Sequence, residues 1–310
     1  MMILNTTLYY TRIEYIKMFK EEMMKSLFKK ILLLMMISAT AVYAQVKSVT
    51  VPSHSVPKQP IIIQGPMPIE AQNLAARLEN VREERTGNYI FYIGTLNDYP
   101  VIVAKTSKGM ENTAAATAIA IERFKPAAVI NQGTSGGHDK SLNVGDIVLG
   151  KRTFNAGNFK TLTKNEKEGS NPFEWLPMDV MASEGSAGEN TDAEKVRYYE
   201  GNPMLLKAAN AVKNQYKRGK VVEGTVASAN FWNNEIDRIN WLHEEFGSSV
   251  EEMEAASAAL ICEAYKVPFL TIRVLSNNKT NGGKYDPSTA KDCQDYVEKV
   301  VKEYIKMLEK

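Results

Sequence analysis

Glu70 and Arg273 are residues of this chain whose type and position could serve chemistry. Glu70 follows the apolar run Ile61–Ile63, and a carboxylate there could hold a water molecule and take its proton. The alternative is a glutamate in the first turn of a helix, facing the helix dipole. Arg273 lies inside the apolar segment FLTIRVLS, where an unpaired guanidinium would be costly, so we expect a carboxylate partner such as Glu70. A purely structural ion pair is the alternative.

The other reactive side chains exclude several kinds of site. Cys262 and Cys293 are too few for a disulfide scaffold. The histidines, His54, His138 and His243, are scattered and no Cys/His spacing resembles a zinc site, so we expect neither a metal nor a cofactor. A net charge of +2 without a dense basic stripe argues against a nucleic-acid partner.

Apolar strands alternate with amphipathic helices along most of the chain, which predicts an α/β fold. We expect a three-layer α/β/α sandwich around a mixed, mostly parallel twisted sheet. The predicted strands are Ile61–Ile63, Tyr89–Ile93, Val101–Ala104, Ala127–Asn131, Asp146–Leu149, Val221–Ala227, Val250–Met253 and Phe269–Leu275. The predicted helices are one with Ile69, Leu74, Ala75 and Leu78 on a face, then 112–124, 203–215, 234–246, 255–265 and one that begins at Ser288 or Thr289.

Ligands of such sheets lie beyond the carboxyl ends of the strands. Candidate site residues do follow predicted strands, namely Glu70, Thr134, Phe231, Glu254 and Asn277. The run Gly133–Gly137 is predicted to be a loop that needs free backbone angles. The polar segment Lys160–Gly201 is predicted to be a long excursion, for which a lid, a partner contact and disorder are the alternatives.

The N-terminal segment has the features of an export leader. Three lysines between positions 25 and 30 precede the apolar run Ile31–Ile37, and Val42–Ala44 is a small-residue cleavage signal. The apolar run is shorter than the roughly 20 residues that span a bilayer, and a retained anchor is the alternative. We expect a leader and signal peptide over 1–44, a mature domain over 45–310 that starts near Gln45, and a periplasmic or secreted location.

Two stretches carry a resemblance to a known family. They are KPAAVINQGTSGGHDKSLNVGDIVLG, over Lys125–Gly150, and VEEMEAASAALICEAYKVPFLTIRVLSNN, over Val250–Asn278. The Gly-rich segment followed by VGDIV, EMEA and PFLTIRVLSN resembles the nucleoside phosphorylase and nucleosidase superfamily, and within it the methylthioadenosine/S-adenosylhomocysteine nucleosidases. The resemblance implies a nucleoside phosphorylase-like fold, a purine nucleoside as substrate and a homodimer, while the export leader by itself favours a role in purine salvage.

The resemblance also assigns roles at the sugar. Glu70, in GPMPIEAQNL, falls on the catalytic glutamate, and Arg273 and Thr134 are expected to complete the water site. Glu254 matches the glutamate that accepts hydrogen bonds from the ribose 2′- and 3′-hydroxyls, which suits a carboxylate. Three further residues are expected near the substrate: Met253 against the ribose, Glu252 as its support or as a helix cap, and Met110 in the sugar or 5′ pocket, with core filler as the alternative for Met110.

At the base, Phe231 matches the aromatic residue that stacks on the purine, and the Trp232 backbone is expected to bind the base edge. Asn277 stands where adenine-specific relatives have an aspartate that protonates N7. An asparagine transfers no proton, but its amide can donate to N7 and to a neighbouring O6. It therefore suits a 6-oxopurine, as in futalosine hydrolases. Weak adenosine-type activity and a lost activity are the alternatives.

A second departure concerns the nucleophile. Phosphorylases of the superfamily have arginines in the first Gly loop and before the Gly-rich segment, whereas this chain has Gly65–Pro68 and Asn131-Gln132 there. An anionic nucleophile requires charge-assisted donors, so their absence favours water and hydrolysis. A purine nucleoside phosphorylase and a non-catalytic purine-binding protein on the same fold remain the alternative functions.

Overall fold

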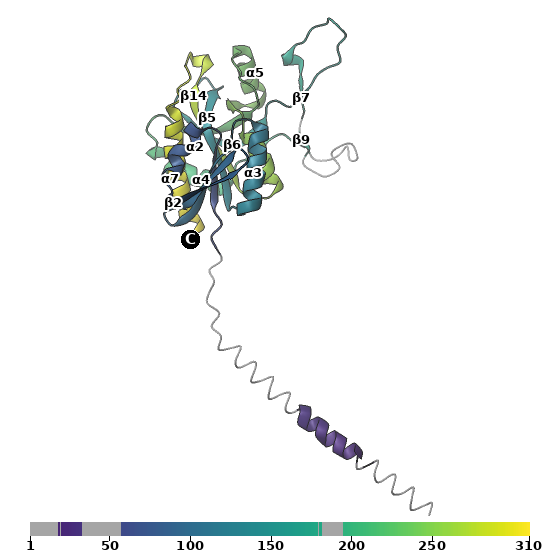
Figure 1. Cartoon of the computed structure of the whole chain (residues 1–310). Helices are drawn as coiled ribbons and strands as arrows, with labels where there is room; N and C mark the ends of the chain where they lie inside the picture. Colours follow the sequence, from purple (N-terminus) through teal and green to yellow (C-terminus); the bar gives the residue numbers. More distant parts are fainter. Residues whose placement is uncertain (1–17, 19, 33–56, 179, 182–194) are drawn as a thin grey trace, which may run out of the picture. The chain divides into compact units, whose positions relative to one another are not determined.

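The structure is a computed structural model that describes residues 18, 20–32, 57–178, 180–181 and 195–310 (Figure 1). The chain divides into two units, Met1–Pro57 and Lys58–Lys310. In the first unit, residues 20–32 form an exposed helix. Within the described ranges, no helix combines the length and the apolar character needed to cross a membrane. The predicted cleavage signal falls outside the described residues, so it and the boundary at position 45 stay predictions.

The second unit is built on a mixed sheet with the strand order β11-β6-β12-β13-β5-β1-β4-β3-β2, and β14 pairs with both β5 and β6. Parallel pairs join β1 to β4 and β5, β14 to β5, and β12 to β6 and β13. The sheet has more antiparallel strand pairs than predicted. Strands β2, β3 and β4 form an antiparallel meander, and β13 and β14 pair antiparallel with β5 and β6 respectively. The strands of this sheet are β1 Ile61–Gly65, β2 Glu79–Thr86, β3 Tyr89–Leu96, β4 Tyr99–Lys105, β5 Ala128–Gly137, β6 Ile147–Asn155, β11 Tyr199–Glu200, β12 Val221–Ser228, β13 Ser248–Glu252 and β14 Phe269–Asn277.

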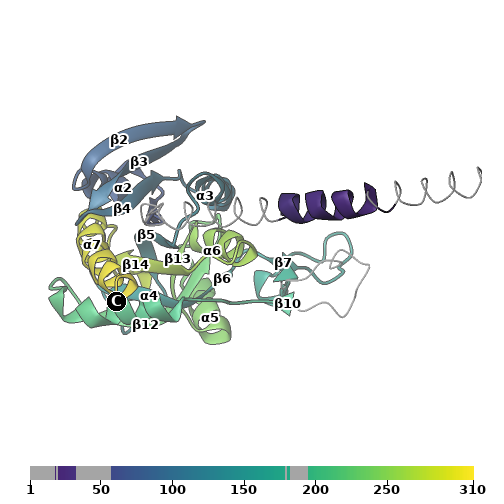
Figure 2. The same ribbon diagram turned by 90° about the horizontal axis from the view of Figure 1, so that it is seen from below.

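Helices cover both faces of the sheet, which confirms the predicted three-layer sandwich (Figure 2). Strand β1 shows why, since its side chains alternate between the faces. Ile61 and Ile63 pack in one apolar cluster with α2, α4 and α7, while Ile62 packs in another with α3 and α6. The helices are α2 Pro68–Ala75, α3 Met110–Phe124, α4 Pro203–Val212, α5 Ile236–Phe246, α6 Ala255–Ala264 and α7 Thr289–Leu308, with 3₁₀ turns at Pro172–Glu174, Lys213–Gln215 and Lys279–Asn281.

Three local predictions were wrong. The run Gly133–Gly137 is no loop but the second half of β5, and none of its glycines has a positive φ. The sequence ENVREERT was missed as a strand, because β2 is an exposed edge strand with few apolar residues. Ile69 is 46% exposed, so it does not share the buried face of α2 with Leu74.

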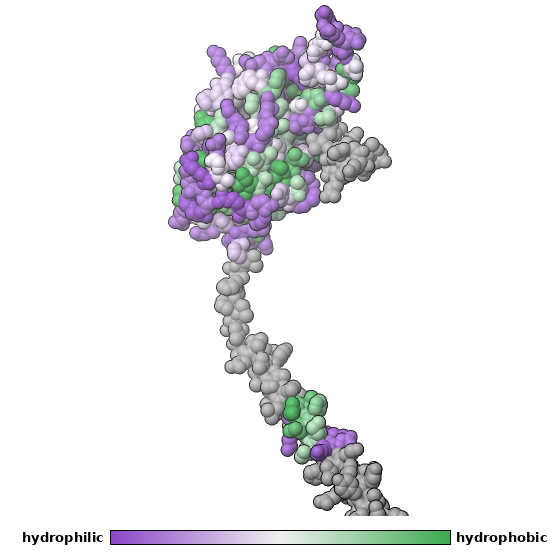
Figure 3. Space-filling view, turned by 45° about the vertical axis from the view of Figure 1, so that its right-hand side comes forward, coloured by the Kyte–Doolittle hydropathy of each residue, from purple (hydrophilic) through white to green (hydrophobic). Residues whose placement is uncertain are grey.

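In its described residues, the predicted excursion after β6 contains the short strands β7 Phe159–Lys160, β8 Leu176–Pro177, β9 Val180–Met181 and β10 Lys195–Val196, and it ends with β11 of the main sheet. Aromatic side chains join it to the rest of the unit, since Phe159 and Phe173 both contact Trp241 of α5. Figure 3 shows hydrophilic side chains over much of the surface and an apolar area on the face in view. The exposed large apolar residues of this unit include Leu260 of α6, which is 40% exposed.

Candidate active site

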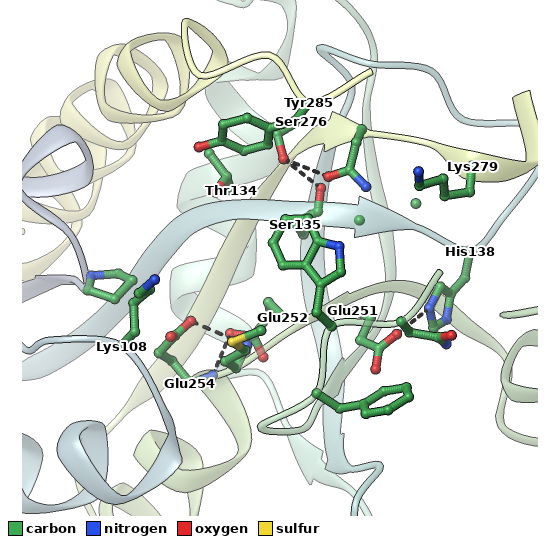
Figure 4. Close-up of a pocket in the computed structure, with 18 of the residues that line it drawn as sticks. Lys108, Thr134, Ser135, His138, Glu251, Glu252, Glu254, Ser276, Lys279 and Tyr285 are labelled. Carbon is green, nitrogen blue, oxygen red and sulfur yellow. Dashed lines mark hydrogen bonds and ion pairs between the residues drawn. The ribbon is translucent and has the colours of Figure 1, made fainter. Parts of the chain in front are cut away.

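A pocket of about 310 Å³ lies beyond the carboxyl ends of β5, β13 and β14, bordered by the loops after β1 and β12 (Figure 4). That volume is within the range of small-molecule sites. The predicted site residues that line it are Glu70, Thr134, Phe231, Trp232, Glu252, Met253, Glu254 and Asn277. The tertiary structure therefore brings together residues that are up to 207 positions apart in the sequence.

Glu70 is buried at one end of this pocket, with 1% of its surface exposed. Its Oε1 accepts hydrogen bonds from the backbone N–H and the hydroxyl of Thr134, both at 2.8 Å, and its Oε2 accepts from the N–H of Met67 at 3.2 Å. Burial raises the pKa of this carboxyl, while the bonds from Thr134 and the charge of Arg273 act in the opposite direction. A carboxylate with a raised pKa is suited to act as a general base near neutral pH.

Arg273 has carboxylate partners, as expected, but they are Glu252 and Glu254, and Glu70, the partner suggested from the sequence, is not one of them. The guanidinium is fully buried, with Nη2 at 2.6 Å from Oε2 of Glu252 and Nη1 at 3.5 Å from Oε2 of Glu254. Nη2 also donates to Asn131 Oδ1. Arg273 is not among the residues that line the pocket, so it holds the carboxylates from behind instead of completing the water site.

The predicted alternatives for Glu252 both hold. Its carboxylate pairs with Arg273, accepts from the N–H groups of Glu254 at 2.9 Å and Ala255 at 3.0 Å, and accepts from the Ser228 hydroxyl. It therefore caps the start of α6 and supports its neighbour. Glu254 keeps a freer carboxylate, whose Oε1 accepts from the N–H of Gly109 at 3.1 Å. Burial and then the charge of Glu252 raise the pKa of Glu254.

The other end of the pocket has the predicted base-binding residues. Phe231 and Trp232 are 50% and 60% exposed, which leaves aromatic surface available for stacking on a purine. Asn277 Oδ1 accepts from the hydroxyl of Ser276 at 3.1 Å, which leaves the amide hydrogens for a ligand. Asn278 instead donates to Leu142 O and caps a 3₁₀ turn.

Some pocket residues were missed, and one prediction fails. Met110 is not among the lining residues; Lys108, two positions earlier, takes that place. Tyr285 lies beside Thr134 in Figure 4 and interacts with its hydroxyl. His138 and Glu251 line the base end. In the sequence, His138 was considered only as a metal ligand and set aside because it is far from the other histidines. Its position directly after the Gly-rich segment could have predicted that it lines the pocket.

The described lining residues include no arginine. Asn131, one of the positions where the phosphorylases place an arginine by resemblance, is buried and donates to Gln64 at 3.1 Å. Gln132 donates to the backbone oxygen of Glu70. Within the described residues, no group of three His, Cys, Asp or Glu side chains could hold a metal ion.

A sequence model of the phosphorylase superfamily matches residues 60–308. The chain belongs to the phosphorylase superfamily. A methylthioadenosine/S-adenosylhomocysteine nucleosidase of a Geobacillus strain is 33% identical over 218 residues, which are 70% of this chain and 84% of the relative. The nucleosidase of Psychromonas ingrahamii is 29% identical over 245 residues, 77% of this chain and 96% of the relative. These matches confirm the resemblance found in the sequence.

Solved structures of the superfamily confirm the fold. The methylthioadenosine/S-adenosylhomocysteine nucleosidase of Neisseria meningitidis, in complex with methylthio-immucillin-A, has a TM-score of 0.63 at 24% identity and covers 80% of this chain and 99% of its own. The futalosine hydrolase of Helicobacter pylori has a TM-score of 0.63 at 21% identity, covering 79% and 98%. The superfamily fold is therefore present from the first strand to the last helix.

Proposed function

We propose that this protein is a purine nucleosidase that hydrolyses the N-glycosidic bond of a purine nucleoside and prefers a 6-oxopurine base. The observation that carries the proposal is Glu70, a buried carboxylate with a raised pKa that lines the pocket and is oriented by Thr134. A protein that only binds purines has no need of such a base. The nucleosidase names of the superfamily relatives support the same reaction.

In this reaction water attacks C1′ as the ribosyl group takes on oxocarbenium character, and Glu70 accepts the proton of that water. Thr134 fixes the carboxylate oxygen through two hydrogen bonds at 2.8 Å. Glu254 accepts from the ribose 2′- and 3′-hydroxyls, since its carboxylate lines the same pocket. Arg273 acts as a positioning residue that holds the carboxylates of Glu252 and Glu254 in place.

The purine stacks on Phe231 beside Trp232, and Asn277 stabilises it as it leaves. The amide of Asn277 donates to N7 and to O6, where negative charge gathers as the glycosidic bond breaks, and the purine anion then takes its proton from solvent. Hydrolysis is favoured over phosphorolysis because the described lining residues offer no arginine to a phosphate, and Arg273 is already held by two carboxylates.

The test is to incubate the purified protein with inosine, guanosine, adenosine and methylthioadenosine, with and without phosphate, and to measure free base and sugar product. Phosphate-independent release of hypoxanthine or guanine together with free ribose is the expected result. Release of adenine alone would contradict the base preference. A requirement for phosphate would establish a phosphorylase, and base binding without release would establish a binding protein.

We also propose that the protein is exported, with its leader removed near Gln45, and that it works as a homodimer. The leader features of the sequence support export. The family resemblance of the sequence supports the homodimer. The mass and N-terminal sequence of the protein from a producing cell would test the first point, and light scattering after size-exclusion chromatography the second. A retained leader or a monomer at micromolar concentration would contradict them.

A further inference from the structure

A buried ionisable pair lies at the base end of the pocket and has no part in the reaction described above. His138 Nε2 is 2.9 Å from Glu251 Oε2, and His138 Nδ1 is 2.7 Å from the hydroxyl of Ser248. Both side chains of the pair line the pocket although His138 is only 2% and Glu251 only 8% exposed. Figure 4 shows the two joined at the side of the pocket away from Glu254.

Two hydrogen bonds hold the ring of His138 against Glu251. A Ser248 hydroxyl that donates to Nδ1 requires the imidazole hydrogen on Nε2, which then donates to Glu251. The carboxylate of Glu251 is thereby held in one orientation. Within the part of the chain that the structure describes, no hydrogen bond engages its second oxygen, Oε1. A buried carboxylate oxygen beside a binding pocket is an acceptor for a ligand N–H.

Strand register places this acceptor opposite Asn277. Gly136 of β5 pairs with Glu251 of β13 on one side and with Asn277 of β14 on the other. Neighbouring strands are about 4.8 Å apart, so the two Cα atoms are separated by roughly 10 Å across a residue without a side chain. The amide nitrogen of Asn277 borders this space, since it would lie 3.4 Å from a Cβ added to Gly136. An N–H acceptor and an amide donor therefore flank a bare glycine floor.

We propose that Glu251, positioned by His138, is the base-specificity residue of the pocket and accepts a hydrogen bond from N1–H of a 6-oxopurine. The inference rests on the proposed function for the identity of the ligand. In a 6-oxopurine the edge facing Asn277 carries the acceptors N7 and O6, and the next ring position carries the donor N1–H. In adenine the same position is an unprotonated nitrogen, whose lone pair meets the carboxylate unfavourably. The pair therefore selects hypoxanthine and guanine against adenine.

The test measures binding of the free bases, so that it does not depend on turnover. Dissociation constants for hypoxanthine, 1-methylhypoxanthine and adenine are determined by calorimetry for the wild type, Glu251→Gln and His138→Leu. Glu244→Gln, an exposed carboxylate of α5, is the matched control. The wild type is expected to prefer hypoxanthine over adenine, and both pocket variants to lower that preference by about tenfold or more, because a site built to bind an N–H discriminates strongly. Methylation of N1 should weaken binding in the wild type and far less in Glu251→Gln.

A wild type that binds adenine as well as hypoxanthine, or binds neither, would overturn the inference. An unchanged preference in Glu251→Gln would do the same. Equal losses for both bases would indicate only a structural role for the pair. Base selectivity without hydrolysis would contradict the proposed function but support the role of Glu251. Hydrolysis without base selectivity would support the proposed function but contradict the role of Glu251.

Discussion

Thr134 donates two hydrogen bonds to a single oxygen of Glu70, one from its backbone N–H and one from its hydroxyl, both 2.8 Å long. The first bond depends on the backbone of strand β5 and remains in any substitution that keeps the N–H of this residue. The second depends on the hydroxyl alone. The backbone bond fixes the position of the carboxylate and the hydroxyl bond adds to its orientation. A substitution that removes only the hydroxyl therefore tests the second contribution alone.

Glu70→Gln is expected to lower kcat by about 100- to 10,000-fold, since an amide cannot take the proton of the attacking water. Thr134→Val keeps the backbone bond and should cost roughly tenfold. Steady-state release of free base measures both. Binding of the free base should be unchanged in Glu70→Gln. A variant that retained most of its turnover would show that Glu70 is not the base.

The pH dependence of kcat/KM should follow from the raised pKa of Glu70. Only the ionised carboxylate can act as a base, so activity is low below its pKa and rises as the pH increases through it. Burial moves this rising limb above the ordinary range of a glutamate. A profile between pH 4 and 8 measures it. An acid limb at or below the usual glutamate pKa, near 4.3, would contradict the assignment.

Gly133 is expected to tolerate no side chain. A Cβ at this position would lie 2.8 Å from both Nη1 of Arg273 and Oε1 of Glu70. Gly133→Ala should therefore destabilise the fold by about 1–3 kcal/mol and displace the base. Gly136→Ala is the matched control, since its Cβ would be in ordinary contact with Asn277 at 3.4 Å. Thermal unfolding distinguishes the two variants, and equal stabilities would contradict the prediction; turnover is compared only between Gly133→Ala and the wild type, because Gly136 itself lines the pocket.

Arg273→Met should destabilise the protein by about 3–5 kcal/mol, because two buried carboxylates lose their shared counter-charge. Turnover should fall as well, since Glu254 loses its support. Arg123→Met, which removes a surface ion pair with Glu84, should change stability by less than about 1 kcal/mol. Denaturant unfolding measures both. Similar losses in the two variants would show that Arg273 has no special structural role.

Asn277→Asp introduces a group that can protonate N7. We expect it to raise kcat/KM for adenosine and methylthioadenosine and to lower it for inosine, where the amide donated to O6. The ratio of the two rates is the measurement, because a general defect in folding lowers both. A fall for every substrate would mean that an acid at this position does not help adenine to leave.

Local patterns in the chain were enough to predict the layered α/β sandwich and the residues that follow its strands. Apolar runs such as Ile61–Ile63 alternate with amphipathic helices, and this pattern is local, so it can be read without the fold. The order of the motifs likewise identified the superfamily and brought Glu70, Thr134, Glu254 and Asn277 forward as candidates. Local pattern failed for β2, whose polar residues lie on an exposed edge.

The pairing of the charged groups, in contrast, depends on the three-dimensional arrangement of the strands. The sequence shows a buried arginine and several carboxylates, but the choice of Glu252 and Glu254 over Glu70 depends on how β13 and β14 align across β5. The same alignment made a strand of the Gly-rich run and set Glu251 opposite Asn277. Strand register joins residues distant in sequence and is fixed by packing of the whole sheet, so no local pattern in the chain contains it.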